Sequence, residues 1–179
     1  LRAAQVLLEE KTATPILIGR PSVIEARLKR FGIRIRPNVD FAVVNPEDDP
    51  RYRQYVDDYF ALVGRQGINP EAARTIVRTN NTVIGALSVK RGEADALICG
   101  AEGRYDRHLR DINQIIGKRP GVCALSGLSL IISQRGAVFF TDTFVNYNPT
   151  AQEIAEITVL AAEEVRRFGI EPKAALICH

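Results

Sequence analysis

Short apolar runs alternate with amphipathic segments along the first part of the chain, and this alternation restricts the folds that it can adopt. The runs at 15–19, 41–44 and 94–99 have the length and composition of buried strands, and the segments between them place apolar residues at helical spacing. Parallel strands need a crossover, usually a helix, to connect them. The pattern therefore predicts an α/β fold with a largely parallel sheet that is flanked by helices.

The pattern changes after Pro120. Two apolar runs, at 122–133 and 137–141, are separated by a short turn, which predicts a β-hairpin. A helix at 150–168 and a strand at 174–178 are expected to follow. This change of pattern indicates a second α/β unit.

We therefore expect two α/β subdomains, at 1–118 and 119–179, of which the second is only partly present. Leu1 stands inside a helical pattern without a capping residue before it, and His179 stands at the tip of the last expected strand. We accordingly expect the chain to be part of a longer polypeptide.

Capping residues predict where several helices begin and end. Ser22 and Glu25 have the spacing of a capping box, and Gly32 is expected to end the helix that they start. Asn69, followed by Pro70, predicts the start of another helix.

The three cysteines, Cys99, Cys123 and Cys178, are far apart and lie in apolar stretches. We expect buried, reduced thiols of a cytoplasmic protein, and their spacing does not indicate a metal site. The net charge of +3 does not by itself imply nucleic acid, and the basic residues at 27–36 are better explained as a solvated helix face. No apolar run is long enough for a membrane span.

The stretch "GAEGRYDRHLRD" at 100–111 brings three arginines, Arg104, Arg107 and Arg110, into seven residues. Glycines allow a close approach of backbone N–H groups to an anion, and arginine binds phosphate or carboxylate through two hydrogen bonds. The alternative is a solvated helix face whose arginines pair with Asp106 and Asp111. The loop alone does not decide between these two interpretations.

A second polar cluster at 141–149 contains Asp142, Thr143 and Asn146. Such side chains can orient a polar ligand, but they also form turns and cap helices. Taken alone, the cluster favours the capping role.

Together these segments resemble the phosphotransacetylase family, which contains phosphate acetyl and butyryl transferases. The matching pieces include "GEADA" at 92–96, "CGA" at 99–101 and "FTDTFVNYNPTAQEIAEI" at 140–157. Over essentially its whole length the chain is still more similar to the phosphotransacetylase-like domains of large bacterial NADP-dependent malic enzymes. "TVIGALSVKRGEADALICG" at 82–100 carries this second likeness.

The resemblance implies a site in a cleft between two α/β subdomains, where true transacetylases move an acetyl group between coenzyme A and phosphate. Arg110 falls on an arginine of that site. Val63 stands where these enzymes carry a second site arginine, and Glu102 replaces one of their small residues. The loss of one arginine implies that ligand binding is retained and catalysis is lost.

The resemblance further implies that this domain binds acetyl-CoA as an effector and contains no catalytic residue. The expected ligand-binding residues for acetyl-CoA or its phosphates are Arg110, Arg104, Arg107, Asp142, Thr143, Asn146 and His179.

Three hypotheses compete. The first is a regulatory acetyl-CoA-binding domain of a homo-oligomeric NADP-dependent malic enzyme, whose catalytic domain lies upstream in the same polypeptide and uses NADP with Mg²⁺ or Mn²⁺ to convert malate to pyruvate and CO₂. The second is an active phosphate acetyltransferase. The third is a structural oligomerisation module.

Overall fold

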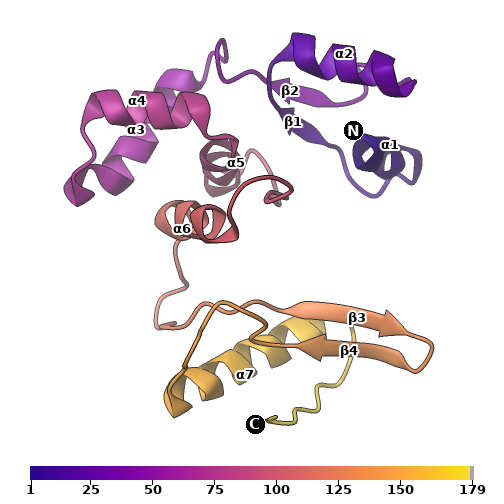
Figure 1. Cartoon of the computed structure of the whole chain (residues 1–179), viewed down its shortest axis with the longest axis vertical. Helices are drawn as coiled ribbons and strands as arrows, with labels where there is room; N and C mark the ends of the chain where they lie inside the picture. Colours follow the sequence, from indigo (N-terminus) through magenta and orange to yellow (C-terminus); the bar gives the residue numbers. More distant parts are fainter. Residues whose placement is uncertain (178–179) are drawn as a thin grey trace. The chain divides into compact units, whose positions relative to one another are not determined.

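The computed structural model describes residues 1–177 and divides the chain into two compact units, Leu1–Gly117 and Lys118–His179. Both units combine helices with short strands (Figure 1). The expected α/β class is confirmed.

The first unit begins with a helix, α1 (Arg2–Glu9), and a βαβ crossover. Strands β1 (Ile16–Ile18) and β2 (Ala42–Val44) pair in parallel, with Ile16 opposite Ala42, and α2 (Pro21–Phe31) connects them. Ile24 and Leu28 of α2 pack with Phe41 in a small apolar core. Burial of these side chains holds the helix against the strand pair.

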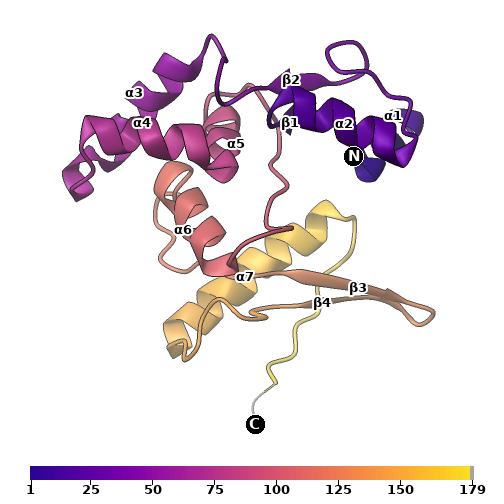
Figure 2. The ribbon, with the colours of Figure 1, turned by 45° about the horizontal axis from the view of Figure 1, so that its top comes forward.

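The rest of the first unit is helical. It contains α3 (Tyr52–Val63), a 3₁₀ turn η1 (Gly64–Gln66), α4 (Pro70–Thr79), α5 (Asn81–Lys90) and α6 (Tyr105–Ile115). Residues 82–88 of α5 are all buried, so this helix is covered on every side and forms the centre of the main core. The helices α3, α4 and α6 surround it in both views (Figures 1 and 2).

The helix caps agree with the sequence at two positions and differ at one. Asn69 caps α4, since its side-chain oxygen accepts a hydrogen bond from the Ala72 N–H at 2.8 Å, and Gly32 ends α2 with a φ of 64°. The capping box at Ser22 was a wrong prediction. The helix α2 already begins at Pro21, whose fixed φ and missing N–H suit the first helical position.

The expected strand at 94–99 was also a wrong prediction. This stretch is irregular, and Ile98 is 91% exposed. A strand needs a neighbour for its backbone hydrogen bonds, and none of the strands that the structure describes pairs with this stretch. Cys99 is therefore exposed rather than buried as expected.

A polar network fixes the chain where it leaves α5. Glu93 accepts hydrogen bonds from the Tyr55 hydroxyl at 2.6 Å, from Arg51 at 2.9 Å and from Arg91 at 2.7 Å. Burial by itself would raise the pKa of Glu93, but these donors outweigh it and hold the pKa below its usual value. The network ties α3 to the end of α5.

The second unit contains an antiparallel hairpin and one long helix. Strands β3 (Ser129–Ser133) and β4 (Gly136–Phe140) pair in register, and α7 (Ala151–Arg167) lies along them (Figures 1 and 2). Thr150 and Glu153 form a capping box at the start of α7. The predicted hairpin and helix are thus confirmed.

The first predicted strand of the hairpin begins later than expected, because carboxylates bind its backbone donors. Glu156 accepts hydrogen bonds from the N–H groups of Cys123, at 3.1 Å, and Ala124, at 2.7 Å. Cys123 is exposed, contrary to the expectation of a buried thiol.

Residues 174–177 form no strand, so the prediction for 174–178 was wrong over that range. Cys178 and His179 lie outside the described residues. In the described part of the chain, no helix has the length and apolar character needed to span a bilayer.

Candidate anion-binding site

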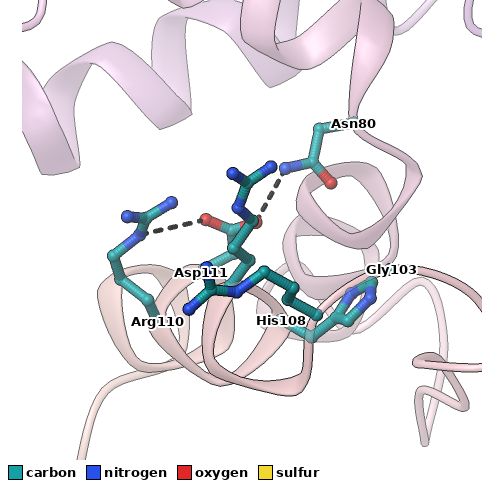
Figure 3. A pocket seen from close by; sticks show the side chains of 7 residues that line it. Asn80, Gly103, His108, Arg110 and Asp111 are labelled. Atoms are coloured by element: carbon teal, nitrogen blue, oxygen red, sulfur yellow. Dashed lines mark hydrogen bonds and ion pairs between the residues drawn. The ribbon is translucent and has the colours of Figure 1, made fainter.

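A pocket of about 380 Å³ lies in the first unit, beside the amino end of α6 and the turn between α4 and α5 (Figure 3). The residues that line it are Asn80, Gly103, Arg104, Arg107, His108, Arg110 and Asp111. All three arginines of the loop predicted as an anion site therefore contribute to one concave surface, from which they could bind an anion.

The loop before α6 is held in place by His108. Its Nε2 lies 2.7 Å from the carbonyl oxygen of Glu102, and its Nδ1 lies 2.8 Å from the Thr82 hydroxyl. A carbonyl oxygen only accepts, so Nε2 carries the proton, and in a neutral ring Nδ1 accepts from the hydroxyl. The ring thereby ties the loop to α5.

Glycine is required in this loop because the histidine ring approaches it closely. Gly103 has a φ of 94°, and a Cβ atom at this position would lie 3.1 Å from the Nε2 of His108. A side chain here would combine backbone strain with a tight contact to the ring.

Arg104 is held by a carboxylate at the start of α6. Its Nε and one terminal nitrogen each lie 2.9 Å from an oxygen of Asp106, and both side chains are exposed. The hydrogen bond from Arg104 lowers the pKa of the Asp106 carboxyl. For Arg104 the structure thus shows the ion pair expected of a solvated helix face.

Arg110 is held less firmly than Arg104. Its Nε lies 3.8 Å from Asp111, a distance too long for a hydrogen bond, and 64% of its side chain is exposed. Arg107 also lines the pocket, and within the described residues no carboxylate lies within 4 Å of its guanidinium. Arg107 and Arg110 are therefore the arginines best able to bind a ligand.

Asp111 and Asn80 complete the wall of the pocket. Asp111 is 8% exposed, and its second carboxylate oxygen accepts a hydrogen bond from the Asn80 amide at 2.7 Å. Asn80 also caps α5, since its Oδ1 accepts from the Thr82 N–H at 3.0 Å. Sequence reasoning missed Asn80 and Thr82 as supports of this loop, because only the fold brings them to α6.

The structure brings Asp142, Thr143 and Asn146 together in one loop of the second unit. Asp142 accepts hydrogen bonds from the N–H groups of Gly127 at 2.9 Å, Val145 at 3.2 Å and Asn146 at 2.6 Å. Burial alone would raise the pKa of Asp142, but these donors lower it.

The Asn146 amide also donates to the Leu125 carbonyl oxygen at 2.7 Å. Asp142 and Asn146 therefore organise the loop. Their role in ligand binding, with that of Thr143, stays a prediction, and His179 lies outside the described residues.

Val63 has no exposed surface and packs in the main core. This position, where true transacetylases are expected to carry a second site arginine, therefore offers no group to a ligand. The local environment agrees with valine, since an arginine would bury a charge among apolar side chains.

The fold is that of a phosphotransacetylase-type α/β protein. The family described as phosphate acetyl/butaryl transferase matches residues 1–179, so the chain belongs to that family. A solved phosphotransacetylase from Streptococcus pyogenes superposes with a TM-score of 0.85 at 31% identity, over 96% of this chain and 51% of that one.

Curated relatives include malic enzymes. The NAD-dependent malic enzyme of Rhizobium meliloti is 76% identical over all of this chain and 23% of its own length. The NADP-dependent malic enzyme of Escherichia coli is 47% identical over all of this chain and 24% of its own length. The chain thus spans about a quarter of these relatives, and its resemblance to the phosphotransacetylase-like domain of malic enzymes is confirmed.

Proposed function

We propose that this chain is a regulatory, acetyl-CoA-binding domain of a malic enzyme and that it does not itself transfer acetyl groups. The observation that carries the proposal is the arginine pocket, found in a chain that makes up about a quarter of malic enzymes of this kind. The buried Val63 supports the loss of catalysis, because a site without its second arginine can bind an anion yet stabilise a transition state poorly.

The pocket suits the phosphates of coenzyme A. Guanidinium groups bind phosphate oxygens through two parallel hydrogen bonds, and Arg107 and Arg110 are available for this contact. Arg104 would have to exchange Asp106 for the ligand, which makes it the weaker candidate. Acetyl-CoA binding by Asp142, Thr143, Asn146 and His179 remains part of this proposal.

The whole protein would convert malate to pyruvate and CO₂ while it reduces a nicotinamide nucleotide, with Mg²⁺ or Mn²⁺ in a catalytic domain upstream. The expected nucleotide was NADP. The relatives include an NAD-dependent and an NADP-dependent malic enzyme, which supports a nicotinamide nucleotide. The relative with 76% identity is the NAD-dependent one, which favours NAD. Rates of malate oxidation with each nucleotide would settle the choice.

The deciding experiment measures malate-dependent nucleotide reduction by the full-length protein, with and without acetyl-CoA. We expect acetyl-CoA to inhibit the intact enzyme and to spare a form that lacks this domain. Arg110→Ala should weaken the inhibition about tenfold or more, the usual effect of losing a charged hydrogen-bonding partner. Turnover without acetyl-CoA should stay the same, since Arg110 plays no part in the reaction.

The matched control for Arg110→Ala is Arg74→Ala. Arg74 is an exposed arginine of the same unit that pairs with Glu71 and does not line the pocket. Inhibition should be normal in this variant. Equal inhibition of the Arg110 variant and the control would contradict the assignment of the pocket.

An active phosphate acetyltransferase is the second candidate, favoured by the 31% identity to a solved phosphotransacetylase. Formation of acetyl-CoA from acetyl phosphate and coenzyme A by the full-length protein would support it. We expect no turnover above that of the Arg110→Ala variant.

A role in assembling a homo-oligomer is the third candidate. The β3–β4 hairpin favours it, because Ile131, Ile132 and Val138 expose much of their apolar surface. If the full-length protein forms a homo-oligomer but binds no acetyl-CoA, the assembly role is favoured over the regulatory one.

A further inference from the structure

Asp111 brings a negative charge to a pocket that is also lined by three arginines. Figure 3 shows its carboxylate between the Asn80 amide and the Arg110 guanidinium. The two interactions are unequal, since Asn80 lies at 2.7 Å and the Nε of Arg110 at 3.8 Å. The carboxylate is thus fixed by Asn80 and only loosely paired with Arg110.

We propose that Asp111 is an internal competitor for Arg110 and thereby sets the affinity of the pocket for anions. The proposal rests on the anion-binding role given to the pocket above. A phosphate that binds Arg110 must either replace Asp111 as its partner or share the guanidinium with it. Asp111 would therefore weaken anion binding, although it lies beside the arginine that binds the anion.

The structure explains why Asp111 would keep opposing the ligand after binding. The side chain is 10% exposed, so it cannot swing out into solvent as an exposed carboxylate would. Asn80 holds it with one end of its amide and caps α5 with the other, so moving Asp111 would also disturb a helix start. Its charge therefore stays within a few ångströms of any anion on Arg110, where the repulsion is substantial.

Arg104 gives a useful comparison within the same pocket. Its partner Asp106 is exposed and bound at 2.9 Å through both oxygens, so Arg104 is neutralised by a carboxylate that can move away. Asp111 instead holds Arg110 weakly from a fixed position. Arg110 remains 64% exposed and ready to accept a ligand, at an affinity that the fixed carboxylate limits.

The test is the affinity of the full-length protein for pyrophosphate, measured by calorimetry for the wild type, Asp111→Asn and Arg110→Ala. Binding that Arg110→Ala removes is assigned to this pocket. Asparagine keeps the size of Asp111 and an oxygen that can accept from Asn80, but it removes the charge. We expect Asp111→Asn to tighten binding about three- to tenfold at low salt, the effect of one nearby charge at a partly exposed site.

Two further measurements separate competition from a general change of charge. The gain in pyrophosphate affinity should shrink when Asp111→Asn is combined with Arg110→Ala. In that double variant Arg110, for which Asp111 and the anion compete, is absent. The gain should also shrink at high salt. Asp58→Asn removes a carboxylate that pairs with Arg91, away from the pocket, and should leave the affinity unchanged.

Asp111→Ser removes the same charge with a smaller side chain and serves if Asp111→Asn does not fold. Unchanged or weaker pyrophosphate binding in the folded variant would overturn the proposal and leave the anion site in place. If the wild type binds no more pyrophosphate than Arg110→Ala does, both the anion site and the competitor role of Asp111 are overturned.

Discussion

The loop after β4 should lose much of its stability when Asp142 is replaced by asparagine. One carboxylate oxygen of Asp142 accepts from the N–H groups of Gly127 and Val145, and the other accepts from the N–H and side-chain amide of Asn146. Asparagine has one acceptor oxygen in place of two. Its NH₂ group must therefore face N–H donors on one side of the loop.

The size of the effect follows from these contacts. Asparagine removes charge-assisted hydrogen bonds on one side and places donor against donor, and each unmet group costs about 1–3 kcal/mol. Because Asp142 is partly exposed, water can satisfy some of the donors. We therefore expect the free energy of unfolding of the second unit to fall by about 2–4 kcal/mol.

The assay combines urea unfolding, followed by circular dichroism, with amide hydrogen exchange at Gly127 and Asn146. Asp58→Asn is the control, because Asp58 is a partly exposed carboxylate on α3 of the first unit that pairs with Arg91. This variant should change the stability of the second unit by less than about 0.5 kcal/mol. Unchanged exchange at Gly127 and Asn146 in Asp142→Asn would refute the loop-organising role of Asp142.

Two further predictions concern the first unit. Gly85→Ala should destabilise it by about 1–2 kcal/mol in urea unfolding, because the added Cβ would lie 2.5 Å from the Leu97 side chain. An unchanged midpoint of urea unfolding would show that Leu97 moves aside at little cost. Glu93→Gln should destabilise it and flatten its acid pH dependence, because the pKa of Glu93 is lowered in the folded state. That stability is present above the unfolded pKa and is lost as pH falls through the folded one, so equal acid profiles of wild type and variant would contradict the network.

Local chemistry predicted the start of α4 and the end of α2, although it misplaced the start of α2 at Ser22. Asn69 and Gly32 act within one turn of their own positions, so their capping roles need no knowledge of the rest of the protein. The strand at 94–99 could not be predicted in this way. An apolar run becomes a strand only beside another strand, and that neighbour is a property of the tertiary fold.

For the candidate site, too, residues close together in the sequence were predicted, and residues that only the fold brings together were missed. The arginine-rich stretch was visible in the sequence because its three arginines lie within seven residues. The supports Asn80 and Thr82 lie more than twenty residues earlier, and only the packing of α5 against α6 brings them to Asp111 and His108. From the sequence alone, polar residues at the start of a helix are interpreted as helix caps. Their contacts with Asp111 and His108 could therefore not be predicted.

The charge arrangement of the pocket supports the proposed regulatory role over catalysis. A catalytic phosphate site gains from arginines that are fixed and unopposed, because they stabilise the transition state most strongly when no reorganisation is needed. Here Arg104 is paired with Asp106, and Arg110 shares its charge with the fixed Asp111. An effector site needs only an affinity that matches the effector's concentration and differs between two states of the enzyme. A pocket in which nearby carboxylates lower the anion affinity of the arginines would suit such an effector site. The change in pyrophosphate affinity in Asp111→Asn measures the size of this effect.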